Sequence, residues 1–160
     1  GEAGFILTLV PRLRLVIAGH GEEVAALAAL ARTWGGQVLV LTPDERTAAA
    51  AGGEAIILKT PAEHPALVLD PHSALVMLFH DHDWETRLLA QALRQKALFI
   101  GAMGSRQTHQ RRLVALAEAG IDAADAARIS GPIGLIPAAR DPQTLALSVL
   151  AQVVAAYNAA

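Results

Sequence analysis

Ser105 and Arg106 are the residues of this chain whose types and placement best suit anion binding. They end the stretch FIGAMGSR (99–106), in which an apolar run gives way to Gly101 and Gly104 before a polar, helix-like pattern begins. The start of a helix offers free backbone N–H groups and the positive end of the helix dipole, both of which attract phosphate or carboxylate. Glycines at this point leave room for close approach. The sequence therefore predicts an anion site at this turn.

The helical pattern after this turn predicts the direction of its basic side chains. At 100° per residue, Arg106 and His109 fall on the side of the apolar residues, whereas Arg111 falls opposite, on the solvent side. The apolar residues on that side are Leu113, Leu116 and Ala117. We therefore expect Arg106 to point inward. The alternative, with Ser105 as a helix N-cap and Arg106 in a surface ion pair, explains the serine but not the two glycines.

A second candidate is the HDHD motif, residues 80–83, which follows the apolar run 74–79. If the strand continues through it, His80 and His82 project to one side and Asp81 to the other. The two histidines would then share a cation, a proton or a ligand oxygen. Asp83 is explained more simply as the N-cap of a following helix. The sequence identifies no third protein ligand for a metal, so metal binding stays open.

A third candidate is the turn GHGEEV, in which His20 stands between Gly19 and Gly21. Two glycines permit a tight turn and close approach to a phosphate, and His20 is the neighbour to consider for the HDHD histidines. The dinucleotide-binding fingerprint, however, needs a third glycine, an uncharged helix start and an acidic residue after the second strand. The chain instead has Val24, Glu22 with Glu23, and Thr42 at those places. Binding of NAD or FAD is therefore disfavoured, and a glycine turn kept for packing is the simpler interpretation.

The three turns follow apolar runs that alternate with helical patterns. The runs at 14–18, 37–42, 54–58, 74–79 and 97–100 are expected strands, and 128–130 is expected to be a short extended piece. The segments 22–33, 84–96, 105–120 and 141–157 are expected helices, and 48–53 a short turn or helix. This alternation predicts an α/β, Rossmann-like three-layer fold with a mostly parallel central sheet. Ligands bind such sheets at the carboxyl ends of the strands, where all three turns fall.

The composition excludes several classes of protein. With 13 Lys and Arg against 15 Asp and Glu, the chain lacks the basic surface of a nucleic-acid-binding protein. No apolar run approaches the length of a membrane span, and the run 5–10 lacks the features of a signal peptide, so a cytoplasmic protein is expected. The absence of cysteine excludes disulfides and thiolate nucleophiles.

The turns, in this order, resemble the C-terminal Rossmann-like domain of the XdhC/CoxI family. The matching pieces are LVIAGHG, HDHD, FIGAMGSR and GPIGL…ARDPQTLALSVLAQVVA, and they span most of the chain from Leu13 onward. Members of this family are accessory factors of xanthine and carbon monoxide dehydrogenases. The resemblance implies binding of the molybdenum cofactor, its protection during sulfuration and its delivery to an apo molybdenum hydroxylase. Molybdopterin carries a phosphate that a Ser-Arg helix start suits, and a pterin whose edge needs polar partners such as histidine.

The chain departs from the family pattern at two turns. The family has Gly-Ala-Gly-His-Val where this chain has His20 between its glycines, and Asp-Ile-Gly-Ala where this chain has residues 136–139, Ile-Pro-Ala-Ala. Residues 1–12 are expected to be the remnant of an upstream segment or an edge strand, and residues 13–160 the Rossmann-like domain.

These inferences predict an accessory protein that holds a phosphate-bearing ligand between 19–21, 80–82 and 104–106. Catalysis by this chain alone is not expected, because it has no thiol to relay sulfur and no evident nucleophile with its base. Two alternatives remain: a nucleotide- or NAD(P)-dependent oxidoreductase or transferase, and a scaffold that binds no ligand and docks on a dehydrogenase or on a second copy of itself.

Overall fold

The computed structural model describes residues 1, 3–63 and 65–160. Helices and strands alternate along the chain. They are β1 (Arg14–Gly19), α1 (Glu22–Trp34), β2 (Gln37–Thr42), α2 (Glu45–Ala51), β3 (Glu54–Ile57), β4 (Ser73–Leu78), the short 3₁₀ helix η1 (His82–Trp84), α3 (Glu85–Leu93), β5 (Phe99–Ala102), α4 (Arg106–Glu118), α5 (Ala123–Ala126), β6 (Ile129–Ser130) and α6 (Pro142–Ala159).

Within the described residues, six parallel strands form one sheet in the order β3-β2-β1-β4-β5-β6. The chain first builds outward from β1 to β3, then returns to place β4 on the other side of β1. The point between β1 and β4 is therefore the topological switch point, where ligands bind in open α/β sheets. The predicted Rossmann-like fold is confirmed.

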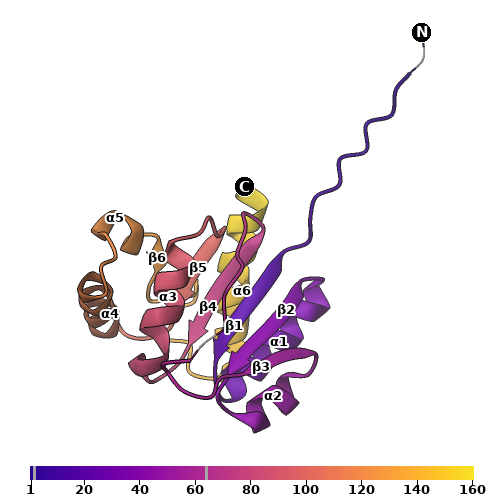
Figure 1. Ribbon diagram of the computed structural model, residues 1–160. Coiled ribbons are helices and arrows are strands. Elements are labelled where there is room, and N and C mark those ends of the chain that lie inside the picture. Colours follow the sequence, from indigo (N-terminus) through magenta and orange to yellow (C-terminus); the bar gives the residue numbers. More distant parts are fainter. Residues whose placement is uncertain (2, 64) are drawn as a thin grey trace.

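Helices cover both faces of the sheet, which gives three layers (Figure 1). On one face, α1, α2 and α6 pack on the side chains of β1 and β4 that point to them, such as Ile17 and Val76. On the other face, α3 and α4 pack on Val16, Leu75 and Met77. Because both faces are covered, β4 is buried along its whole length.

Side-chain caps decide where several helices begin. Asp44 accepts hydrogen bonds from the N–H groups of Arg46 and Thr47, so α2 starts at Glu45, three residues before the expected position. Asp141 caps α6 by accepting from the N–H of Thr144, and Pro142 occupies the first helical position, as expected. In the part of the chain that the structure describes, no helix combines the length and apolar character of a membrane span.

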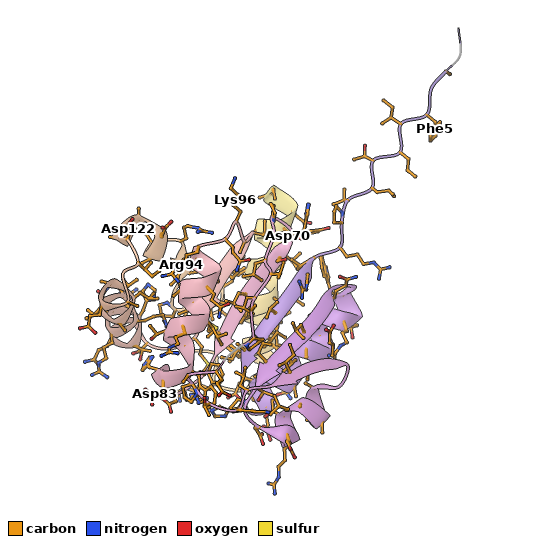
Figure 2. The ribbon with its side chains drawn as sticks, viewed as in Figure 1. Phe5, Asp70, Asp83, Arg94, Lys96 and Asp122 are labelled. Atoms are coloured by element: carbon orange, nitrogen blue, oxygen red, sulfur yellow. The ribbon has the colours of Figure 1, made fainter. Side chains whose placement is uncertain are left out.

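The described residues that precede β1 belong to no helix or strand. The side chain of Phe5 is 99% exposed and lies far from the body of the domain (Figure 2). The stretch first contacts the domain at Pro11, whose carbonyl accepts a hydrogen bond of 2.8 Å from the hydroxyl of Tyr157 on α6. The first strand, β1, begins three residues later, at Arg14.

Candidate functional site

The carboxyl ends of β1, β4 and β5 lie side by side at the carboxyl-terminal end of the sheet. Each strand continues into one of the three turns. Figure 2 labels Asp83 at this end of the sheet and Asp70, which precedes β4, at the opposite end. The turn after β1 meets the turn after β4, because the ring centroids of His20 and His80 are 6.1 Å apart. The two histidine-bearing turns are therefore neighbours in space.

A cavity of about 220 Å³ lies between the ends of β4 and β5. Its walls combine apolar surface with two imidazole rings and the start of α4. The lining residues are Phe79, His80, His82, Met103, Gly104 and Thr108. Phe79 itself is buried and stacks against Trp84 at a centroid distance of 6.1 Å, which fixes that wall. The cavity thus offers both apolar contacts and hydrogen-bonding groups.

The HDHD motif does not continue the strand, so its side chains do not alternate as expected. β4 ends at Leu78, and Asp81 caps η1 by accepting a hydrogen bond from the N–H of Asp83. Asp81 therefore has the capping role expected of Asp83. The alternation was wrong because a capped 3₁₀ turn replaces the strand at residue 82.

The two histidines of the motif have different partners. The Nδ1 atom of His82 lies 3.1 Å from Oε2 of Glu85, whereas Nε2 of His80 lies 3.9 Å from Oε1 of Glu23 on α1. Across residues 1, 3–63 and 65–160, no three His, Cys, Asp or Glu side chains come together as a metal site. The structure thus assembles no complete set of protein ligands for a cation around these rings.

A buried ion pair lies beneath the cavity. Glu85 on α3 and Arg112 on α4 both have side chains no more than 2% exposed. The guanidinium donates from Nε to Oε2 of Glu85 at 3.0 Å and from Nη2 to Oε1 at 3.2 Å. Nη2 also donates to the carbonyl oxygen of Met103 at 2.7 Å. Arg112 therefore ties together the two turns that form the cavity, those after β4 and β5.

His109 completes this network on α4. Its Nδ1 atom lies 3.2 Å from Nη1 of Arg112, and its ring packs so closely on Gly131 that a Cβ there would come within 2.2 Å of it. Burial and the positive charge of Arg112 lower the pKa of His109 from its usual 6.5, although Glu85 opposes this effect. The neutral imidazole is the form that suits the folded protein.

The lowered pKa of His109 predicts a pH dependence of stability. The unfolded chain binds a proton on His109 at higher pH than the folded chain does. The contribution of neutral His109 to stability is therefore fully present above pH 6.5 and is lost as the pH falls from there through the folded pKa. The variant His109→Asn offers Arg112 an oxygen acceptor but cannot titrate. The free energy of unfolding of wild type relative to this variant should therefore decrease as urea denaturation is repeated at lower pH. A difference that does not change with pH would contradict the assignment.

Ser105 caps α4, as the alternative interpretation expected, because its Oγ accepts a hydrogen bond from the N–H of Thr108. Arg106, however, is exposed, so the prediction that it points inward was wrong. The buried face of α4 centres on Arg112 and Leu116, and the first residue of the helix lies to one side of that face. Ala117, also expected to face inward, is exposed.

The start of α4 keeps free donors for an anion. The N–H groups of Arg106 and Gln107 precede the first intrahelical hydrogen bond. Neither group finds an acceptor among the residues that the structure describes. Two backbone donors, the positive end of the helix dipole and an exposed guanidinium therefore remain at the outer rim of the cavity.

The turn after β1 is less open to a phosphate. The N–H of Gly21 donates to Oγ1 of Thr47 at 2.9 Å, and that hydroxyl donates to Asp44 at 2.6 Å. The N–H of Gly21 is therefore already hydrogen-bonded to a protein side chain. The adjacent cleft of about 600 Å³ is lined by the acidic Glu22 and Asp44 as well as by Arg46. Weak binding of a dinucleotide at this turn stays a prediction.

Two of the predicted site glycines have a packing role. Gly19 ends β1, where a Cβ would lie 2.7 Å from the carbonyl oxygen of Leu78 on β4. Gly101 lies within β5, where a Cβ would lie 2.5 Å from Cδ1 of Ile133. Gly104 differs from both because its φ of +134° is a conformation that side chains rarely adopt. It turns the chain at the mouth of the cavity.

The sequence of this chain matches a known protein family over most of its length. The sequence profile described as the XdhC Rossmann domain matches residues 15–153. The chain belongs to this family. Its XdhC Rossmann domain is 35% identical over 150 residues to a curated Escherichia coli (strain K12) protein named molybdenum cofactor insertion chaperone PaoD, with 94% of this chain and 42% of that protein covered.

The fold of the XdhC Rossmann domain also occurs in a solved structure. A protein from Bacillus halodurans described as a xanthine dehydrogenase superposes with a TM-score of 0.75 at 22% sequence identity, covering 93% of this chain and 44% of that one. This likeness shows a shared fold. The chain spans less than half the length of both relatives.

Sequence reasoning missed the pair beneath the cavity of this XdhC Rossmann domain. Glu85 follows His82 by three residues, a spacing that brings two helical side chains together. Arg112 precedes the buried Leu116 by four residues, so helical spacing places it on the buried face of α4. Charged residues are rarely fully buried, however, and their expected place is the surface. Only the packing of α3 against α4 reveals that the two charges meet.

Proposed function

We propose that this chain binds the molybdenum cofactor and holds it for insertion into a molybdenum hydroxylase of the xanthine or carbon monoxide dehydrogenase type. The observation that carries the proposal is the similarity over 94% of the chain to a protein named as a molybdenum cofactor insertion chaperone. The apo hydroxylase is the proposed partner. The proposal assigns this chain the tasks of binding and shielding, with no catalytic residue.

The residues at the edge of the sheet fit the chemistry of this cofactor. Its phosphate needs hydrogen-bond donors and positive charge, which the free N–H groups of Arg106 and Gln107 and the guanidinium of Arg106 offer. Its pterin is flat and carries polar edges, which suits a cavity with the apolar Phe79 and Met103 and with two histidines in its walls. The cofactor supplies the metal chemistry of the enzyme that receives it.

Fluorescence titration tests this proposal directly. Trp84 stacks on Phe79 beside the cavity, whereas Trp34 packs against Tyr157 at the end of α1. A Trp34→Phe variant therefore leaves the emission of Trp84 as the reporter. We expect saturable quenching with molybdenum cofactor and none with NAD(P)H, FAD or CTP.

Two results would contradict the proposal. Quenching by a dinucleotide alone would favour the nucleotide-dependent enzyme. An unchanged Tm with every compound would favour the scaffold, since a ligand that binds only the folded state must stabilise it.

A matched pair of arginine variants tests the place of the phosphate. Arg106→Ala should weaken cofactor binding by roughly 0.5–1 kcal/mol, the scale of an exposed charge pair. This is less than the 1.5–3 kcal/mol, approximately, that a buried charge-assisted bond would contribute. Arg111→Ala, on the same helix and also exposed, should leave the Kd from the same titration unchanged. Equal effects of the two variants on the Kd would contradict the placement of the phosphate at the start of α4.

A further inference from the structure

The ion pair beneath the cavity determines which nitrogen of His82 carries a hydrogen. Glu85 is buried against Arg112, and both of its oxygens accept hydrogen bonds from the guanidinium. A carboxylate paired in this way is ionised and can only accept. The contact of 3.1 Å between Oε2 of Glu85 and Nδ1 of His82 is therefore a hydrogen bond only if Nδ1 donates. In the neutral ring, the lone pair then lies on Nε2.

The same ion pair determines the opposite tautomer of His109. A guanidinium can only donate, so Nδ1 of His109, 3.2 Å from Nη1 of Arg112, must accept. Its hydrogen therefore lies on Nε2. One buried pair thus fixes two histidines in complementary states, one on each side of the junction between α3 and α4.

The accessible part of the His82 ring faces the cavity. Glu85 holds Nδ1 in the interior, whereas the side chain of His82 as a whole is 41% exposed and lines the cavity with Phe79 and Met103. The ring edge left for a ligand is therefore the edge that bears Nε2. Ser105 and Arg106 do not line this cavity, so a phosphate at the start of α4 stays outside it.

We propose that Glu85 is a positioning residue that presents the Nε2 lone pair of His82 to the cavity, where it accepts a hydrogen bond from an N–H group of a flat heterocycle. The inference rests on the proposed function, because the pterin of the molybdenum cofactor is such a heterocycle. It adds the orientation of the ligand: the N–H-bearing edge lies inward against His82, and the phosphate lies outward at α4. Arg112 takes part only by keeping Glu85 ionised and in place.

Nitrogen-15 NMR of the imidazole rings tests the positioning without any ligand. Ring nitrogens with and without a hydrogen differ strongly in chemical shift. Above the pH at which the rings are protonated, we expect His82 to show the hydrogen on Nδ1 and His109 to show it on Nε2. In Glu85→Gln, His82 should lose its fixed tautomer, a change that a merely structural role of Glu85 would not produce. A hydrogen on Nε2 of His82 in the wild type would overturn the inference.

Two variants of His82 test the binding role and leave the buried pair intact. His82→Asn keeps an N–H group near the Nδ1 position, facing Glu85, but has no acceptor at the Nε2 position. It should weaken binding of molybdenum cofactor about tenfold, as expected for the loss of one good hydrogen bond. His82→Gln carries a carbonyl oxygen that reaches the Nε2 position and should retain most of the affinity. His72→Asn, at the opposite edge of the sheet, is the control and should bind as the wild type does.

The outcomes separate this inference from the proposed function. Equal affinity of His82→Asn and wild type would overturn the inference while the proposed function stands. Failure of the wild type to bind the cofactor would overturn the proposed function and with it the assigned ligand, while the NMR experiment would still decide the tautomer. Tenfold weaker binding by His82→Asn, with His82→Gln close to wild type, would support both.

Discussion

Replacing Arg112 with methionine is expected to lower the free energy of unfolding by about 3–5 kcal/mol, because it leaves the carboxylate of Glu85 buried without its counter-ion. The side chain of Glu85 is 1% exposed, so water cannot replace the lost guanidinium. The substitution also removes the donor to the carbonyl of Met103. For a domain of this length the Tm should fall by roughly 10 °C. Urea denaturation would measure the loss in free energy of unfolding, and calorimetry would measure the change in Tm.

The neighbouring Arg111→Met variant is the matched control, because Arg111 is exposed on the same helix and should change stability little. The double variant Glu85→Met/Arg112→Met should recover much of the loss, since apolar side chains of similar volume often replace a buried ion pair at little cost. A double variant as unstable as Arg112→Met alone would show that the pair is not the cause.

The structure keeps a costly pair where the proposed site needs rigidity. A fully apolar junction between α3 and α4 would pack as well, but it would leave His82 without a fixed partner. The double variant of Glu85 and Arg112 should therefore fold with much of the wild-type stability. It should nevertheless bind the cofactor more weakly than the wild type does. We therefore expect the pair to contribute more to the orientation of His82 than to stability.

The fold was predictable because strands and helices alternate with strong periodicity. The runs of β1, β2 and β4 are largely apolar and largely buried, as expected for parallel strands that helices cover on both faces. The boundaries were less predictable where a cap competes with periodicity. Asp44 and Asp81 each moved a boundary by forming a local hydrogen-bonded turn.

The site was only partly predictable. The rule that ligands bind at the carboxyl ends of strands correctly brought together the turns that contain His20, His80 and Gly104. The predicted direction of the Arg106 side chain was wrong, because the inward side of the helix was defined by apolar residues that include the exposed Ala117. The role of Thr47 at Gly21 depends on a contact between α1 and α2 that no local pattern encodes.

Replacing Gly19 with alanine is expected to destabilise the protein by about 1–3 kcal/mol or more, because the added methyl group meets backbone that cannot move. Gly19 pairs with Leu78 at the switch point between β1 and β4. A Cβ there would lie 2.7 Å from the carbonyl oxygen of Leu78 and 2.8 Å from its carbonyl carbon. Relief requires β1 and β4 to separate, which breaks the sheet at the edge that bears His20 and His80. Urea denaturation would measure the loss of stability.

Gly101→Ala distinguishes this cause from a general intolerance of alanine in the strands. The Cβ at Gly101 would also be crowded, but its nearest neighbours are the ends of the Ile133 and Phe99 side chains. These side chains can rotate away, so Gly101→Ala should cost less than Gly19→Ala. If Gly19→Ala proves as stable as the wild type, close contact between β1 and β4 is not the reason for a glycine at this position. The turn would then need glycine for some other purpose, and approach of a ligand to its backbone would become the better interpretation.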